Sequence, residues 1–101
     1  MNLVAMIGNV ATKPELTRMK SGKSACTFRL AVARPGEESA DFFTIVAFER
    51  QAEVINEYLC TGRRVAVEGR LHHSSWDDAN GESRSKVEIV ANRVELLGRK
   101  S

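Results

Sequence analysis

Residues 41–62, DFFTIVAFERQAEVINEYLCTG, contain the change of periodicity that decides the fold. The first part of this stretch alternates along two faces, which is typical of a β-strand. From Glu49 onward the apolar residues recur at helical spacing instead: Ala52, Ile55 and Leu59. Gly62 is placed as a C-terminal helix stop. The sequence therefore predicts a strand that runs directly into a helix of about three turns.

Both faces of the strand at residues 41–48 are largely apolar. One face carries Phe43, Ile45 and Ala47. The other carries Phe42, Thr44, Val46 and Phe48. A sheet face turned to water does not need this much aromatic surface. We therefore expect one face to join the core, and we treat the second as a candidate functional surface.

The rest of the chain consists of predicted strands and turns. Residues 24–34 form a strand that turns Phe28 to the core and Arg29 to the outside. The other strands are predicted from an apolar run and two alternating stretches: residues 3–7, 64–72 and 87–97. Asn80-Gly81 is a strong hairpin signal between the last two. A short extension is possible at residues 16–20.

The resulting element order is β-β-β-α-β-β. This all-β pattern predicts an OB-fold, a five-stranded Greek-key barrel, with one α-helix between strands three and four. We expect a single domain over residues 1–98 and a frayed C-terminus at residues 99–101. An OB-fold binds oligonucleotides or oligosaccharides on its second and third strands and on neighbouring loops.

Charge is segregated along the chain more strongly than its net value of +2 indicates. Residues 13–34 contain six basic residues and one acidic residue, a net charge of +5. Residues 35–62 contain six acidic residues and one basic residue, a net charge of −5. One basic face and one acidic end would explain this pattern. Ordinary solvated charges on alternating strands would also explain it.

Other functional classes find little support in the sequence. No apolar run approaches the roughly 20 residues of a membrane span, and no signal peptide precedes the first strand. Cys26 and Cys60 stand alone, so we expect reduced thiols, a cytoplasmic protein and no zinc. His72 and His73 point to opposite faces of a strand and do not form a shared metal site. No catalytic arrangement or phosphate-cradling glycine loop is present, so neither an enzyme nor a cofactor is expected.

Aromatic rings on a basic surface indicate single-stranded nucleic acid. Every base offers a π-face on which rings such as Phe42, Phe48 and Trp76 can stack, and Arg29 lies on the neighbouring strand. Weaker candidates for phosphate contacts are Arg70, Lys20, Lys23 and His72. These residues also have structural interpretations. Phe48 would then be a core residue beside the helix, and the cations would be ordinary solvated charges.

The chain resembles the bacterial single-stranded-DNA-binding proteins of the SSB family over nearly its whole length. The resemblance rests on the order and spacing of six segments: VAMIGNV, KPEL, SGKSACTFRLAVAR, FTIVAFERQAEVINEYLCTG, RVAVEGRLHHSSW and NGESRSKVEIVANRVELLG. It implies base stacking at Phe42, Phe48 and Trp76 and a basic backbone contact at Arg50. It also implies a homotetramer with the first strand at the subunit interface, and a role in DNA replication, recombination or repair.

The chain departs from the pattern of that family at several positions. The connection between strands two and three is short and acidic, and it offers only Pro35-Gly36 where a stacking aromatic is common. Phe43 and Ala66 replace a frequent His and Tyr that are associated with subunit contacts, so a dimer remains possible. The family's acidic tail, which recruits repair proteins, is not seen, so we expect no tail-mediated recruitment. These features favour shorter or weaker binding and an accessory or plasmid-borne form.

A dimeric primosomal or replication-restart OB-fold protein, acting mainly as an interaction module, is the alternative. Its relatives lack the helix between strands three and four, which is well marked in this sequence at residues 49–59. The helix therefore favours single-stranded DNA binding. Oligosaccharide or purely protein binding would leave the basic segment at residues 13–34 unexplained.

Overall fold

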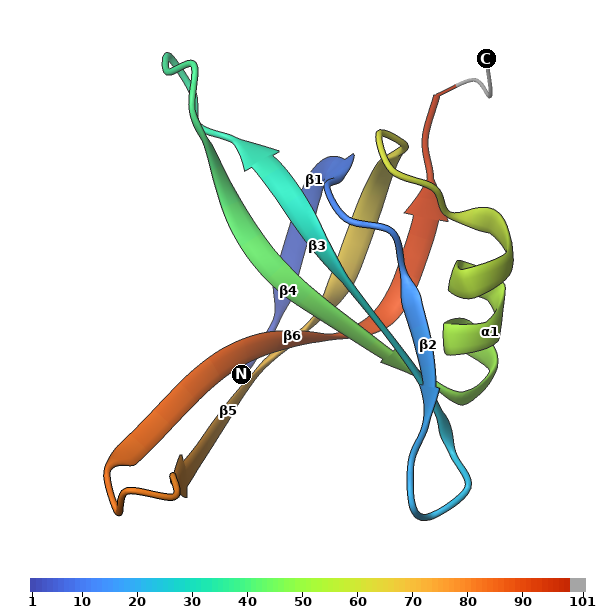
Figure 1. Ribbon diagram of the computed structural model, residues 1–101. Helices are drawn as coiled ribbons and strands as arrows, with labels where there is room; N and C mark the ends of the chain where they lie inside the picture. Colours follow the sequence, from blue (N-terminus) through green and yellow to red (C-terminus); the bar gives the residue numbers. More distant parts are fainter. Residues whose placement is uncertain (99–101) are drawn as a thin grey trace.

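The computed structural model describes residues 1–98 and consists of strands with one helix (Figure 1). The predicted frayed end at residues 99–101 lies outside the described residues, and the single-domain boundary stays a prediction. The elements in chain order are β1 Val4–Val10, β2 Glu15–Arg18, β3 Ser24–Ala33, β4 Ala40–Phe48, α1 Glu49–Tyr58, β5 Arg64–Asp77 and β6 Ser83–Leu96.

The strands form one sheet that closes into a barrel. Their order is β1-β5-β6-β4-β3-β2, and an additional pairing joins β1 to β3. All pairings are antiparallel except that of β4 with β6, where Ile45 and Val46 lie opposite Ile89 and Val90. The five-stranded OB-fold barrel is thus confirmed. The sixth strand, β2, is the short extension expected near residue 16, and it pairs with β3 at the edge of the sheet.

The core fills the barrel with the side chains that the alternation predicts to point inward. Its largest fully buried members are Phe28, Leu30, Ile45, Ile55 and Ile89. The helix α1 covers one end of this core, because Ala52, Ile55 and Leu59 are buried in the same cluster. The predicted helix between the third and fourth strands of the barrel is thus confirmed, and it closes one end of the barrel. Among residues 1–98, no helix combines the length and hydrophobicity needed to cross a bilayer.

The helix ends earlier than the sequence indicates. It stops at Tyr58, and Leu59 already has extended backbone angles of φ −86° and ψ 141° while its side chain is buried. Gly62 is therefore not the helix cap. It takes a positive φ of 93° in the turn after the helix, where the Arg63 N–H donates to the Cys60 carbonyl oxygen. The helix thus ends at its C-cap Leu59, whose N–H donates to the Ile55 carbonyl oxygen, before the chain reaches the glycine.

Two glycines allow backbones to approach each other inside the barrel. A Cβ on Gly8 would overlap the Ala31 carbonyl oxygen, at the point where β1 changes its partner from β5 to β3. A Cβ on Gly69 would overlap the Val90 carbonyl oxygen. Beside Gly69 the β5–β6 register shifts by one residue, which leaves Asn92 as the extra residue of a β-bulge.

Beyond Gly69, strands β5 and β6 leave the barrel as a long hairpin. The hairpin and the β3–β4 connection project on the side away from α1 (Figure 1). Leu71 continues the alternation of Val65 and Val67 but is exposed, because no other strand covers this part of β5. Asn80 and Gly81 form the predicted turn, and Asp77 and Ser83 are the last paired residues.

Candidate nucleic-acid interface

The strand register places Phe42 and Phe48 on one outward side of the β3–β4 pair. Phe42 lies opposite Ala31, and Phe48 lies opposite Ala25. The exposed fractions are 53% for Phe42 and 37% for Phe48, whereas Ile45 between them is fully buried on the other side. Because side chains alternate along a strand, the two rings share a face that the core does not use. The alternation predicted for residues 41–48 is confirmed.

Arg29 supports the exposed ring of Phe42. Its guanidinium carbon lies 5.3 Å from the Phe42 ring centroid, within the range of a cation–π contact. Arg29 is directly opposite Thr44, and its neighbours on the same face are Thr27 and Ala31. These small side chains leave the ring and the guanidinium as the most prominent groups on this part of the sheet.

The same face continues from β4 across β6 to β5. Val46 lies opposite Val90, and Val90 lies opposite Arg70. Farther along the hairpin, three cross-strand pairs follow on this side: His72 with Glu88, Ser74 with Lys86, and Trp76 with Arg84. Trp76 lies within β5 rather than in the loop, and 46% of it is exposed. We call the outward side of β3, β4, β6 and β5, from Arg29 to Trp76, the outer face.

The structure thus brings six of the nine predicted site residues onto the outer face. They are Phe42, Phe48, Trp76, Arg29, Arg70 and His72. Lys20 and Lys23 lie in the β2–β3 turn, which is next to Phe48 because β3 begins at Ser24 and Ala25 pairs with Phe48. This turn adds positive charge at one end of the outer face.

Arg50 is placed differently. It lies in the first turn of α1, where it borders a groove of about 200 Å³ between α1 and β6. Val54, Leu59 and Leu96 line the same groove. Arg50 therefore belongs to the helix and not to the sheet, although it follows Phe48 by two residues.

The connection between β3 and β4 holds its only cation in ion pairs. The Arg34 guanidinium lies 2.7 Å from an Asp41 oxygen and 3.8 Å from a Glu37 oxygen. The hydrogen bond to Asp41 raises the pKa of Arg34 above its ordinary value. Glu38 adds a further negative charge. This connection is acidic, so a nucleic-acid backbone is repelled at this end of the outer face.

The tip of the β5–β6 hairpin is organised around Asp78. One carboxylate oxygen accepts hydrogen bonds from the backbone N–H groups of Asn80 and Glu82 at 2.9 and 3.0 Å. The other accepts from Arg84 Nε at 2.9 Å. The Arg84 hydrogen bond is the main reason why the pKa of Asp78 lies below its ordinary value, and the Glu82 and Asn80 N–H groups act in the same direction.

Acidification should loosen this tip before it disturbs the barrel. Because the pKa of Asp78 is lower in the folded state, its stabilising effect is complete above the unfolded value of about 3.9 and disappears as the pH falls through the folded value. In an NMR titration, the Asn80 and Glu82 amide signals should shift at low pH while the Phe28 amide signal does not. Asp78→Ala should remove that transition. Unchanged Asn80 and Glu82 signals down to pH 2 would contradict this account.

The sequence interpretation missed Lys86, Arg84 and Glu88, which also lie on the outer face. The Lys86 ammonium is 6.0 Å from the Trp76 ring centroid and 3.5 Å from a Glu88 oxygen. Their alternation along residues 84–88 was present in the sequence. It was not recognised because the apolar residues Val87 and Ile89, which face the opposite side, defined the start of the predicted strand. The bulge at Asn92 also reverses the alternation of β6 relative to its part in the barrel.

Metal-ligating and thiol groups do not add to the outer face. Within residues 1–98, no three His, Cys, Asp or Glu side chains are grouped as a metal site requires. Both cysteines are free thiols. Cys26 is buried in the core, where desolvation raises its pKa, and Cys60 is exposed in the turn after α1.

Comparison with known proteins gives consistent matches. The model of the Single-strand binding protein family matches residues 1–97. A single-stranded DNA-binding protein of Treponema pallidum is 43% identical over 103 residues, which cover 96% of this chain and 58% of that protein. Single-stranded DNA-binding protein 1 of Staphylococcus aureus is 34% identical over 102 residues, which cover 96% of this chain and 65% of that protein. The single-stranded DNA-binding protein of Thermotoga maritima is 39% identical over 106 residues, which cover 98% of this chain and 75% of that protein. The chain thus spans less than two thirds of the first two relatives.

Proposed function

Because the chain belongs to the single-strand binding protein family, we propose that it binds single-stranded DNA without sequence preference. The observation that carries this proposal is the outer face, where three exposed aromatic rings and several cations lie on the same side of one sheet. A protein with this activity would serve DNA replication, recombination or repair, at the nucleoid or a plasmid in the cytoplasm.

Bases and phosphates would use different side chains. Phe42, Phe48 and Trp76 offer ring faces on which bases stack, with a typical contribution of about 1–3 kcal/mol per base. Arg29 lies beside the Phe42 ring, and Arg70 lies on the same strand as Trp76, opposite Val90. Both arginines would contact the phosphates. Neither interaction distinguishes one base from another, since every base has a π-face and every nucleotide a phosphate. Binding of this kind needs no chemical step at the protein.

The peripheral cations would extend this contact beyond the rings. Lys20 and Lys23 would meet the backbone at the Phe48 end, and His72 would meet it on the hairpin. Arg50 would reach the bound DNA only if the DNA continued past Phe48 toward α1. The acidic β3–β4 connection limits the path at the Phe42 end, which favours a short binding site.

Gel shift with a dT oligonucleotide tests the proposal. A stable complex should form at low salt and should resist an excess of duplex competitor, because paired bases cannot stack on the rings. Absence of a complex at low salt would overturn the proposal. The interaction-module alternative, a primosomal-type protein, would then remain. The helix α1 argues against that alternative.

We also propose that the chain assembles into a homo-oligomer, most simply a tetramer, with a dimer as the smaller form. Residues Val4–Gly8 of β1 pair only with β5, while β3 pairs with β1 only at Asn9 and Val10. One edge of β1 therefore has free N–H and C=O groups within the described chain. Leu3 and Ile7 are exposed on its outward side.

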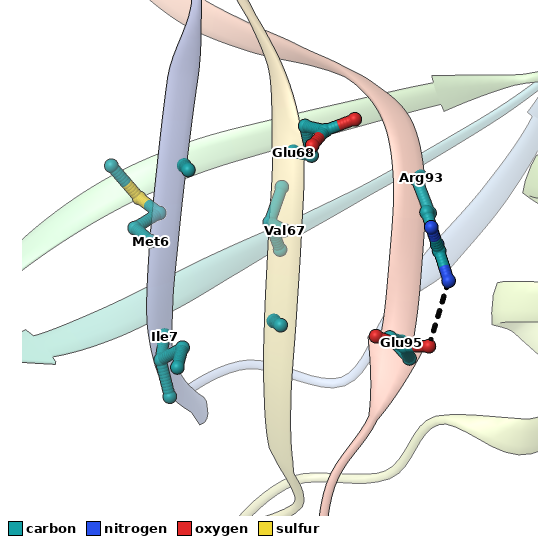
Figure 2. A pocket seen from close by; sticks show the side chains of 8 residues that line it. Met6, Ile7, Val67, Glu68, Arg93 and Glu95 are labelled. Atoms are coloured by element: carbon teal, nitrogen blue, oxygen red, sulfur yellow. Dashed lines mark hydrogen bonds and ion pairs between the residues drawn. The ribbon is translucent and has the colours of Figure 1, made fainter.

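A shallow groove of about 440 Å³ beside this edge supports the same proposal (Figure 2). Two rows of side chains cross β1, β5 and β6 there: Ile7, Ala66 and Glu95, and then Ala5, Glu68 and Arg93. The apolar members form the floor. Arg93 and Glu95 form an ion pair of 2.9 Å at the rim. A second copy presenting the same surface would bury the floor and meet complementary charges.

Ile7→Lys should reduce the molar mass measured by light scattering after size exclusion. The lysine would place a charge on the apolar floor of the groove, and a second copy would have to bury that charge. Val54→Lys on α1 is the matched control, because Val54 is 41% exposed and Ile7 is 49% exposed. The control should keep the wild-type mass. An unchanged mass for Ile7→Lys, or a monomeric wild type, would overturn the assembly proposal without touching DNA binding.

A further inference from the structure

Two cations flank Trp76 on the part of the hairpin that lies outside the barrel. Arg84 is directly opposite Trp76, and Lys86 is one pair closer to the barrel, opposite Ser74. Lys86 is therefore the diagonal neighbour of Trp76, a position from which a long side chain can reach the ring. Both cations have exposed side chains, but their partners differ.

The charge of Arg84 is already used within the hairpin. Its Nε donates to the Asp78 carboxylate at 2.9 Å, and a terminal nitrogen lies 3.7 Å from Glu82. Asp78 is itself fixed by two backbone N–H groups. Releasing Arg84 would leave the carboxylate without its cation and would loosen the turn. Arg84 therefore maintains the hairpin and is poorly placed to exchange partners.

Lys86 is held more loosely. Its ammonium lies 3.5 Å from Glu88, longer than a strong charge-assisted hydrogen bond, and 6.0 Å from the Trp76 ring centroid. No contact in the described chain joins it to the hairpin turn. An ammonium on a four-carbon stem can turn from this position toward solvent with little loss of contact energy.

We propose that Lys86 is the phosphate contact that accompanies base stacking on Trp76. This inference rests on the proposed function and adds a residue to it. In the free protein Lys86 lies beside the Trp76 ring and Glu88. When a base stacks on Trp76, the phosphate of that nucleotide replaces Glu88 as the partner of the ammonium. Trp76 and Lys86 then act as one unit that binds one nucleotide on the hairpin.

Glu88 gives a second reason why a bound DNA strand needs Lys86. It lies opposite His72 and stands on the outer face, where a carboxylate repels phosphates. Lys86 neutralises it in the free state, and after the exchange the positive charge of the same ammonium offsets the repulsion between Glu88 and the phosphate. Without Lys86, the carboxylate would face the backbone directly.

The test is the salt dependence of binding to a dT oligonucleotide, measured for Lys86→Gln and for Arg84→Gln. Each variant removes one positive charge from the same strand. The amide of the glutamine in Arg84→Gln can still donate a hydrogen bond to Asp78 and hold the turn, so Arg84→Gln is the charge-matched control. For single strands the logarithm of the affinity falls with the logarithm of salt by about 0.7 per neutralised phosphate. Lys86→Gln should reduce the slope by about 0.7, and Lys86→Arg should restore it. Arg84→Gln should keep the wild-type slope.

A wild-type slope in Lys86→Gln would overturn the inference, and so would an equal loss of slope in Arg84→Gln. The second result would mean that net charge alone matters. Wild-type protein that fails to bind the oligonucleotide would instead refute the proposed function, so the two failures are distinct. Thermal unfolding curves of the variants verify that the fold is intact.

Discussion

Replacing Phe42 and Trp76 together by alanine should nearly abolish binding to a dT oligonucleotide. Each ring offers one stacking platform on the outer face, and each lost stack costs about 1–3 kcal/mol. Each single variant should therefore bind roughly 5- to 150-fold more weakly, since 1.4 kcal/mol corresponds to a factor of ten. Anisotropy of a labelled oligonucleotide is the measurement, because the double variant contains no tryptophan.

Tyr58→Ala is the matched control for this experiment. Tyr58 is an aromatic residue with 60% of its surface exposed, but it lies at the end of α1 and not on the outer face. Its loss should leave the affinity unchanged. If Tyr58→Ala weakened binding as much as Trp76→Ala, or if the double variant bound like the wild type, the outer face would not be the binding surface.

Gly69→Ala should be among the most destabilising single-methyl changes in the barrel. Gly69 is buried at the β-bulge, and its new Cβ would overlap the Val90 carbonyl oxygen of the neighbouring strand. Backbone cannot move aside as a side chain can. We expect a loss of about 3 kcal/mol in the free energy of unfolding, at the upper end of the range for overpacking. The midpoint of thermal unfolding should fall by roughly 12–24 °C.

Gly22→Ala separates the effect of space from that of backbone conformation. Gly22 has a φ of 90°, but no atom lies near the position of an added Cβ. Alanine there carries only the cost of a left-handed conformation, about 1–2 kcal/mol. Calorimetry at equal protein concentrations should therefore give a clearly lower midpoint of thermal unfolding for Gly69→Ala than for Gly22→Ala. The reverse order would mean that the close approach of β5 and β6 is not a constraint.

The alternation of residues 41–48 was sufficient to predict the two faces of β4. A strand in a closed barrel must bury every second side chain, so the alternation separated the side chains that share a face with Ile45 from those that share a face with Phe42. Because both sets are largely apolar, the alternation did not by itself decide which of them joins the core. The helix that plugs the barrel was likewise predictable from its periodicity. The glycine signal was misleading, since the helix ends at Tyr58 and Gly62 lies in the turn that follows.

Only the part of the outer face that lies on the barrel could be predicted in full, and the part on the β5–β6 hairpin could not. Arg29 and Phe42 are linked by simple register between neighbouring strands, and both were recognised. Lys86 and Arg84 were not, because the last two strands were predicted over residues 64–72 and 87–97, whereas β5 extends to Asp77 and β6 begins at Ser83. The polar residues of this part of the hairpin lie outside the core, so they lack the apolar alternation that marks a buried strand. Arg50 was correctly predicted to lie in the helix, and its role as a backbone contact followed only from the family resemblance.

The most direct test of the account is a titration of dT oligonucleotides that follows Trp76 fluorescence over a series of salt concentrations. Trp76 is the only tryptophan, so any quenching reports on the outer face. The account predicts strong quenching and an affinity that falls steeply as salt rises, with a slope that counts the phosphates in contact. An absence of both quenching and binding at low salt would contradict it, and the barrel would then be a protein-interaction module without a nucleic-acid ligand.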